Sequence, residues 1–237
     1  MRVAVGGIIH PRWTVAPYLE AMHKLQAGPH TIVPCWVADG EVAGANAYLV
    51  DDRPRYNRET ADTETLRQTY ERLGTMRNML AQIALGLDCE ALLSVDSDII
   101  VPETLLVELA EANHPWVGAL VPNSPTNRRV WNVFHYMEMD GLCQHFEPVG
   151  VGADGVEWPR YGAWHCDPRD TMMVRDLAVG AVALYSREIL LRARWHSNGR
   201  GHQEDLGFAA DAFAAGYRAA YVPVVCEHLT VARATHA

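Results

Sequence analysis

The sequence lacks the cysteine patterns of zinc sites and of disulfide-rich secreted domains. Its five cysteines are scattered along 237 residues, and no two of them form a CxxC pair. They are Cys35, Cys89, Cys143, Cys166 and Cys226. An odd number of dispersed cysteines is typical of reduced thiols in a cytoplasmic protein. We therefore expect free thiols and no cysteine-based zinc centre.

Long hydrophobic runs are also missing. The longest apolar stretches are too short and too interrupted to cross a bilayer. The chain begins Met1-Arg2-Val3-Ala4-Val5, which runs directly into a predicted strand and does not have the form of a secretory leader. These absences predict a soluble cytoplasmic protein without a transmembrane segment.

Positive charge is scarce. The chain has 20 Lys and Arg residues against 29 Asp and Glu residues, and its formal net charge is −9. This balance argues against broad adhesion to nucleic acid or to an anionic membrane, although a local basic channel stays open. What the chain does have is apolar content: 49% of its residues are hydrophobic, enough for the core of one large α/β domain.

The order of predicted elements indicates an α/β fold. Predicted strands cover residues 3–9, 31–38, 91–95, 116–121, 179–185 and 218–225. Predicted helices cover residues 14–25, 63–87, 102–112, 186–195 and 204–215, and Gly74 is a point where the longest of them could divide. Alternating strands and helices predict a mainly parallel sheet with right-handed crossovers. The long stretch 122–178, rich in glycine and proline, is expected to be irregular.

Two aspartates follow the most apolar predicted strand. The run 91–95 ends at Asp96-Ser97-Asp98, so both carboxylates are expected at the carboxyl end of a parallel strand, where open α/β sheets bind ligands. Together they can hold one hard divalent cation, because Mg²⁺ favours one or two protein carboxylates with water and substrate phosphates. The alternative is a polar strand end followed by a helix cap.

Three further sites have charged residues: two lie at the ends of predicted elements, and one lies on the apolar face of a predicted helix. Glu204-Asp205 opens a predicted helix, where acidic residues also complement the helix dipole. Asp39 precedes Gly40 after the second predicted strand, which is also the form of an ordinary turn. Arg77 falls on the apolar stripe of its predicted helix, so its head group either binds a ligand or reaches out to solvent.

Taken in order, these features resemble the nucleotide-sugar-dependent glycosyltransferases of the GT-A fold, in particular the large inverting family 2-like group with a cellulose-synthase-like core. The most specific matches are the blocks Ser94-Val95-Asp96-Ser97-Asp98 and Gln203-Glu204-Asp205-Leu206-Gly207-Phe208. The chain departs from the family at Ala38-Asp39-Gly40-Glu41, where many members have D-D-x-S. The resemblance implies a Rossmann-like α/β domain over 1–237, with a donor-binding half (1–121) and a loop-rich acceptor-binding half (122–237).

The resemblance also implies roles for individual residues. The donor-binding residues would be Asp39, Arg77, Asn78, Asp96 and Gly180. A Mn²⁺ or Mg²⁺ cofactor would be held by Asp96, Asp98 and His228. The catalytic residues would be Asp205, as general base, and Glu204, as an aid to acceptor binding. Trp131 and Trp164 would stack on the acceptor; the alternative is that these tryptophans fill the core under a long loop.

The implied reaction moves a sugar from a UDP- or GDP-sugar to an acceptor hydroxyl. A divalent cation offsets the charge that grows on the leaving diphosphate, and a carboxylate removes the hydroxyl proton. Direct attack predicts inversion of the anomeric carbon, with a retaining enzyme on the same fold as an alternative. The acceptor stays open: a glycan, a lipid-linked sugar, a small molecule, a protein or a modified nucleic acid.

Two other functions compete with this one. A sugar nucleotidyltransferase usually has a glycine-rich loop with a lysine or arginine after the first strand, whereas this chain has Gly6-Gly7-Ile8-Ile9-His10-Pro11-Arg12. A silent binding module would keep the fold without the acidic residues, which are present here.

Overall fold

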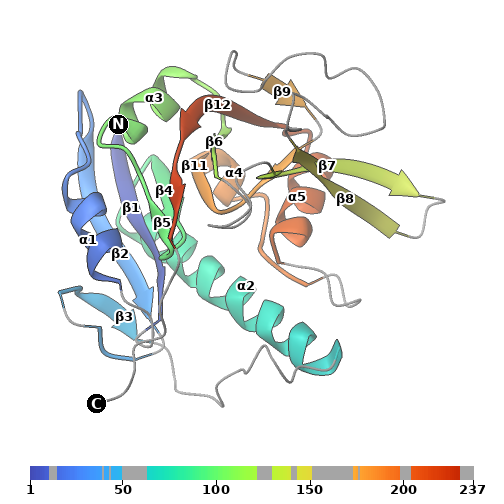
Figure 1. Ribbon diagram of the computed structural model, residues 1–237, viewed down its shortest axis with the longest axis horizontal. Coiled ribbons are helices and arrows are strands. Elements are labelled where there is room, and N and C mark those ends of the chain that lie inside the picture. Colours follow the sequence, from blue (N-terminus) through green and yellow to red (C-terminus); the bar gives the residue numbers. More distant parts are fainter. Residues whose placement is uncertain are drawn as a thin grey trace.

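The computed structural model of the protein is drawn in Figure 1. The structure describes residues 1–10, 15–38, 40–42, 44–49, 63–121, 130–139, 143–150, 173–175, 177–197 and 204–229.

In the described part of the chain, an eight-stranded sheet has the strand order β3-β2-β1-β4-β11-β6-β12-β9. The strands are β1 (Arg2–Ile9), β2 (Thr31–Ala38), β3 (Ala47–Leu49), β4 (Ala91–Val95), β6 (Trp116–Leu120), β9 (Met173–Arg175), β11 (Val182–Ser186) and β12 (Ala219–Val225). β1 pairs in parallel with β2 and β4, and β12 pairs in parallel with β6. β11 lies antiparallel between β4 and β6. The predicted α/β class with a mixed, mainly parallel sheet is confirmed.

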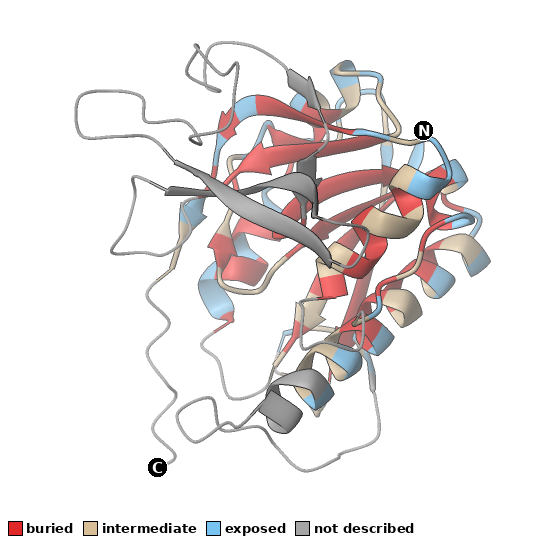
Figure 2. Ribbon diagram, turned by 90° about the vertical axis from the view of Figure 1, so that its right-hand side faces the viewer, coloured by how far each residue is buried: buried red, intermediate tan, exposed pale blue. Residues whose placement is uncertain are grey.

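Helices cover both faces of this sheet (Figure 1). α2 (Thr63–Gly86), α4 (Arg187–Leu190) and α5 (Glu204–Ala214) share one core with sheet residues such as Ala4 and Leu92. α1 (Ala16–His23) and α3 (Leu105–Glu111) share the other core with Val3 and Leu93. Because neighbouring strand residues face opposite cores, the central strands β4 and β6 are buried at every position, and most of their residues are apolar. Figure 2 shows that the buried residues concentrate in the sheet and on the helix sides that face it.

Two helix ends lie close to their predicted positions, the start of α4 and the end of α5, although α4 ends at Leu190, five residues before the predicted end at 195. Ser186 caps α4, because its hydroxyl oxygen accepts a hydrogen bond from the Ile189 N–H at 3.5 Å. Gly216 follows α5 with φ +86°, a left-handed conformation that glycine adopts at no steric cost.

Two other predictions of local structure are wrong. Gly74 does not divide the long helix, since α2 runs without a break from Thr63 to Gly86. The stretch 122–178 is not irregular throughout: β7 (Val130–Met139), β8 (Cys143–Gly150) and β10 (Leu177–Val179) form a separate three-stranded sheet. β7 is rich in β-branched and aromatic residues, but its apolar and polar residues do not alternate cleanly, so periodicity does not reveal it.

The cysteines agree with the expected free thiols where they are described. Cys35, Cys89 and Cys226 are free and buried. Burial raises the pKa of Cys35 and that of Cys226 to about 12. The side chains of Cys143 and Cys166 lie outside the described part. No described helix is both long and apolar enough to cross a membrane.

Candidate active site

The aspartate pair lies at the carboxyl end of β4, beside β1. β1 has β2 on one side and β4 on the other, so the strand order reverses at this point, which is where open α/β sheets form their ligand crevice. The turn after β4 is held by backbone hydrogen bonds from the Asp96 N–H to the Ala181 oxygen (2.8 Å) and from the Ile99 N–H to the Asp96 oxygen (3.0 Å). The two carboxylates therefore project from an ordered turn.

Asp98 meets His228, which is 130 residues further along the chain. The short strand β13 (Glu227–His228) pairs with β5 (Ile99–Ile100), directly after the aspartate turn. The Leu229 N–H also donates to the Asp98 backbone oxygen at 2.7 Å. As a result, the Asp98 Oδ2 and His228 Nε2 atoms lie 3.2 Å apart, with 34% and 20% of their side chains exposed. The structure brings these two predicted ligands together.

Asp96 has a different partner, the buried guanidinium of Arg77 from α2. The Arg77 Nη2 donates to the Asp96 Oδ1 at 2.8 Å, and its Nε donates to the Glu204 Oε1 at 3.0 Å. The Asp205 Oδ1 lies 3.7 Å from the same Nε. Only 6% of Arg77 is exposed. One arginine thus joins the end of β4 to the acidic pair at the start of α5.

Burial and mutual repulsion shape the charges of this cluster. Burial raises the pKa of Asp96 to about 7; Arg77 opposes the rise, while Asp98 and Asp205 add to it. Burial, and then Asp205, raise the pKa of Glu204, again against the effect of Arg77. Burial alone would lower the pKa of Arg77, but Asp96, Asp205 and Glu204 outweigh it and raise that pKa. Three carboxylates around one guanidinium leave the cluster short of positive charge.

Gly180 makes room for the Asp205 side chain. A Cβ atom at Gly180 would lie 2.0 Å from the Asp205 Oδ2, closer than any real contact. The Asp205 Oδ1 is buried and has no hydrogen-bond partner within the described residues. The resemblance predicts that Gly180 lets the donor sugar approach the backbone; in the structure, the space that its missing side chain leaves is taken by Asp205.

Asn78 and Gly74 bind α2 to the segment ahead of α5. The Asn78 amide donates to the Trp195 oxygen at 2.7 Å, and its own oxygen accepts from the Trp195 N–H at 3.0 Å. A Cβ at Gly74 would lie 2.9 Å from the Trp195 oxygen and 3.3 Å from the Glu204 Cβ. In the structure the Asn78 amide is bonded to the Trp195 backbone; a role in donor binding stays a prediction. From the sequence, Gly74 is a glycine inside a long predicted helix, and such a glycine suggests a break in the helix. The close packing that it allows is visible only in the structure.

The remaining predicted site residues cannot be placed as side chains. Asp39 and Trp164 lie outside the described residues, and for Trp131 only the backbone, in β7, is described.

The side-chain atoms of Asp98 and His228 that face each other are suitable ligands for a divalent cation. Two neighbouring ligands of an octahedral ion, at bond lengths of about 2.1 Å, lie about 3 Å apart, close to the 3.2 Å observed. A carboxylate and an imidazole suit Mn²⁺ or Mg²⁺ when phosphate oxygens and water supply the other positions. In the described ranges, no three His, Cys, Asp or Glu side chains gather closely enough to hold a metal by themselves.

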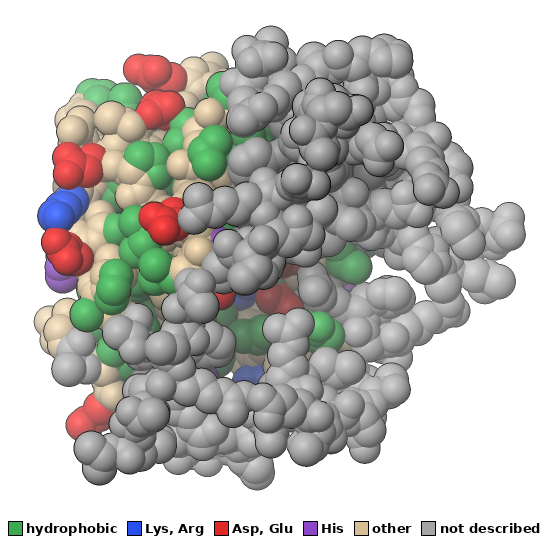
Figure 3. All heavy atoms as spheres, in the orientation of Figure 1, with side chains coloured by type: hydrophobic (Ala, Val, Ile, Leu, Met, Phe, Trp, Pro, Cys, Tyr) green, Lys and Arg blue, Asp and Glu red, His purple; other side chains and the backbone are tan. Residues whose placement is uncertain are grey.

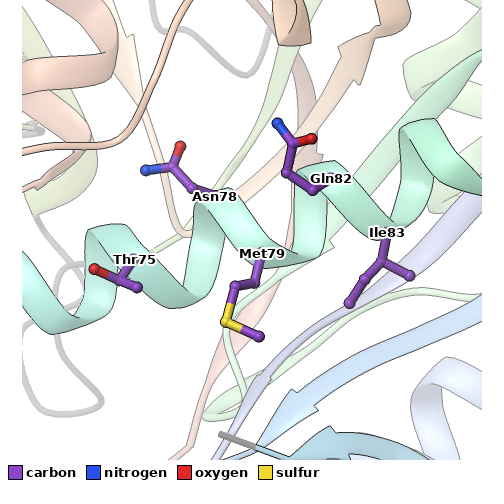
Figure 4. A pocket seen from close by; sticks show the side chains of 5 residues that line it. All are labelled: Thr75, Asn78, Met79, Gln82 and Ile83. Atoms are coloured by element: carbon purple, nitrogen blue, oxygen red, sulfur yellow. The ribbon is translucent and has the colours of Figure 1, made fainter.

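Other surface features lie apart from these acids. A groove of about 390 Å³ is lined by residues of α2: Thr75, Asn78, Met79, Gln82 and Ile83 (Figure 4). It shares only Asn78 with the predicted site residues. Figure 3 shows acidic side chains scattered over the described part of one face and not gathered into a single patch.

No protein-family model matches this chain, and no curated protein matches it. Among solved structures, the chain is similar to A197 from STIV, with 13% sequence identity and a TM-score of 0.51 over 97% of this chain and 86% of that one. CMP:2-keto-3-deoxy-manno-octonic acid synthetase complexed with CTP has 10% identity and a TM-score of 0.47 over 95% and 90% of the two chains. Mannose-1-phosphate geranyltransferase from Thermus thermophilus has 15% identity and a TM-score of 0.39 over 94% and 73%. Scores below 0.5 carry no argument about function, and the likeness to A197 establishes the fold of this chain alone.

Proposed function

We propose that this protein is a metal-dependent glycosyltransferase that moves a sugar from a nucleoside-diphosphate sugar to an acceptor hydroxyl. The observation that carries the proposal is the meeting of Asp98 with His228, 3.2 Å apart, at the carboxyl end of the sheet. This pair stands next to a second acidic group, formed by Asp96, Glu204 and Asp205 around Arg77.

Asp98 and His228 would hold the cation. Asp96, on the same turn, is bonded to Arg77 through its Oδ1, and its role as a third ligand stays a prediction. When bound, Mn²⁺ or Mg²⁺ would offset the charge on the diphosphate leaving group. The protein residues then have two tasks: to orient the donor at the end of β4, and to activate the acceptor from the start of α5.

Asp205 is the better candidate for the general base. Its side chain is 24% exposed, against 5% for Glu204, and its Oδ1 has no hydrogen-bond partner among the described residues. Because the Oδ1 is buried, the exposed part of the carboxylate would accept the proton of an acceptor hydroxyl. The Arg77 Nε lies 3.7 Å from this Oδ1.

Attack by a hydroxyl that a base activates inverts the anomeric carbon, so we propose inversion over the retaining alternative. Proton NMR of the first product reports the anomeric configuration. A retained configuration would contradict the role given to Asp205.

A sugar nucleotidyltransferase is the second candidate. The names of the two neighbours with TM-scores of 0.47 and 0.39 correspond better to it than to glycosyl transfer, although at these scores they lend it no weight. The same cation pair would serve a nucleoside triphosphate. The two activities separate by their products: a glycosyltransferase releases a nucleoside diphosphate from an NDP-sugar, and a nucleotidyltransferase releases pyrophosphate from a triphosphate and a sugar or sugar phosphate.

The test is a thermal-shift screen of UDP, GDP and the other nucleoside diphosphates, each with and without Mn²⁺. We expect one base to raise the unfolding midpoint only with the cation, since a ligand stabilises the state that it binds. The Asp98→Asn variant should lose this shift. His196→Gln is the matched control, because His196 and Asp211 form a similar pair at 3.3 Å that has no neighbouring aspartate turn. The proposal fails if no diphosphate acts with Mn²⁺ or if Asp98→Asn keeps the full shift.

A further inference from the structure

We infer that Arg77 is a positioning residue, which holds Asp205 and Glu204 at the start of α5 against Asp96 at the end of β4, and that it does not contact the donor. This differs from the donor-binding role implied by the family resemblance. It rests on the proposed function only in taking Asp205 as the base.

The guanidinium is already engaged on two sides. Its Nη2 is bonded to Asp96 at 2.8 Å and its Nε to Glu204 at 3.0 Å, with Asp205 at 3.7 Å. Because only 7% of its side chain is exposed, Arg77 offers little surface to a phosphate on the solvent side. A buried arginine surrounded by carboxylates fixes their positions relative to one another.

The helix that carries Arg77 is itself held firmly. One turn before Arg77, the absence of a side chain at Gly74 lets the helix approach the Trp195 backbone and the Glu204 Cβ. Directly after Arg77, the Asn78 amide makes two hydrogen bonds to the Trp195 backbone. The Trp195 ring stacks on Phe208 of α5, with 4.2 Å between ring centroids. Arg77 therefore acts from a rigid frame that includes the first turns of α5.

Asp205 is confined from the other side by Gly180. A methyl group there would overlap the carboxylate, at 2.0 Å from Oδ2. The orientation of the Asp205 carboxylate is thus set between Gly180 and Arg77. Without Arg77, Glu204 would be a buried charge with no partner, and Asp205 would lose the group that faces it.

The test compares donor binding with turnover in two variants that keep the fold. Arg77→Lys keeps the charge but cannot span two carboxylates, and Arg77→Met/Glu204→Gln removes the buried pair together. We expect calorimetric affinity for the Mn²⁺ nucleoside diphosphate to stay within about threefold of the parent. We expect kcat to fall by about 100-fold or more, with the donor KM unchanged, since only activation of the acceptor is lost. Arg187→Met is the control, because Arg187 is a half-exposed arginine that bonds the Leu85 and Cys89 oxygens.

Two results would overturn the inference. A loss of nucleotide affinity of about tenfold or more in both variants, with the unfolding midpoint intact, would mean that Arg77 binds the donor. Full turnover in either variant would mean that positioning by Arg77 is not needed.

If the parent protein binds no nucleotide with Mn²⁺, the proposed function is refuted and the role of Arg77 is not yet decided. A double-mutant cycle of unfolding stability then tests Arg77. Arg77→Met should lower the unfolding midpoint, and adding Glu204→Gln should restore most of it. If the two changes are simply additive, Arg77 does not hold Glu204 and the inference falls.

Discussion

Asp96 and Asp98 differ by one residue and have nearly the same exposed fraction, 33% and 34%, yet they meet opposite partners. Asp96 is bonded to Arg77, a buried cation that keeps its charge at all working pH values. Asp98 faces His228, whose imidazole is a partly exposed metal-ligand type. The exposed fraction of the side chain therefore does not separate the two acids, although burial raises the pKa of Asp96; their partners do. Asp96 belongs to the internal framework, and Asp98 is the acid to which we assign the proposed cation.

The largest effect on stability is expected at the Asp96 side. Arg77→Met should lower the free energy of unfolding by about 3–5 kcal/mol, because it leaves Glu204 buried without a counter-charge. Denaturant unfolding measures this change, and the double variant Arg77→Met/Glu204→Gln should recover most of it. If Arg77→Met lowers the free energy of unfolding by less than about 1 kcal/mol, the buried ion pairs of Arg77 do not stabilise the fold.

A smaller loss is expected where Gly180 meets Asp205. Gly180→Ala should cost about 1–3 kcal/mol and displace the carboxylate, since the added methyl group overlaps it. Gly86→Ala is the matched control, because a Cβ at Gly86 meets nothing within 4 Å. Turnover should fall in the first variant only; equal behaviour of the two would contradict the confinement of Asp205.

At Asp98 the expected change in stability is within about 1 kcal/mol, since a partly exposed pair contributes little. Asp98→Asn should instead abolish the stabilisation by Mn²⁺ with nucleotide. Calorimetric titration with Mn²⁺, with nucleotide present, measures this directly. If the Asp98→Asn variant still binds the cation strongly, then Asp96, and not Asp98, is its ligand.

The smallest effects separate two histidine–aspartate pairs of similar geometry. His228→Gln and His196→Gln should each change the free energy of unfolding by about 0–1 kcal/mol. Only His228→Gln should weaken the Mn²⁺ response. If both variants respond alike, the meeting of His228 with Asp98 has no bearing on the cation.

Much of the fold could be predicted because buried strands leave short apolar runs and amphipathic helices leave periodic patterns. The strand predicted at 31–38 is β2 with the same bounds, and the helix predicted at 63–87 is α2 within one residue. The strand β7 could not be predicted, because its polar residues recur at every third position (Asn132, His135 and Glu138) and not at the two-residue period of a half-buried strand. Gly74 suggests a break because a helix-interior glycine usually weakens a helix, whereas here close packing against Trp195 requires it.

The sequence by itself determined the α/β class, the strand that ends in two aspartates and the acidic start of α5, because each depends on neighbours along the chain. Only the tertiary structure decided which acid has which partner. Arg77 reaches Glu204 across 127 positions and Asp98 reaches His228 across 130, so these pairings exist only once the sheet order and the β5–β13 pairing bring distant segments together. Local patterns record burial and periodicity, but charge pairing depends on distances in space.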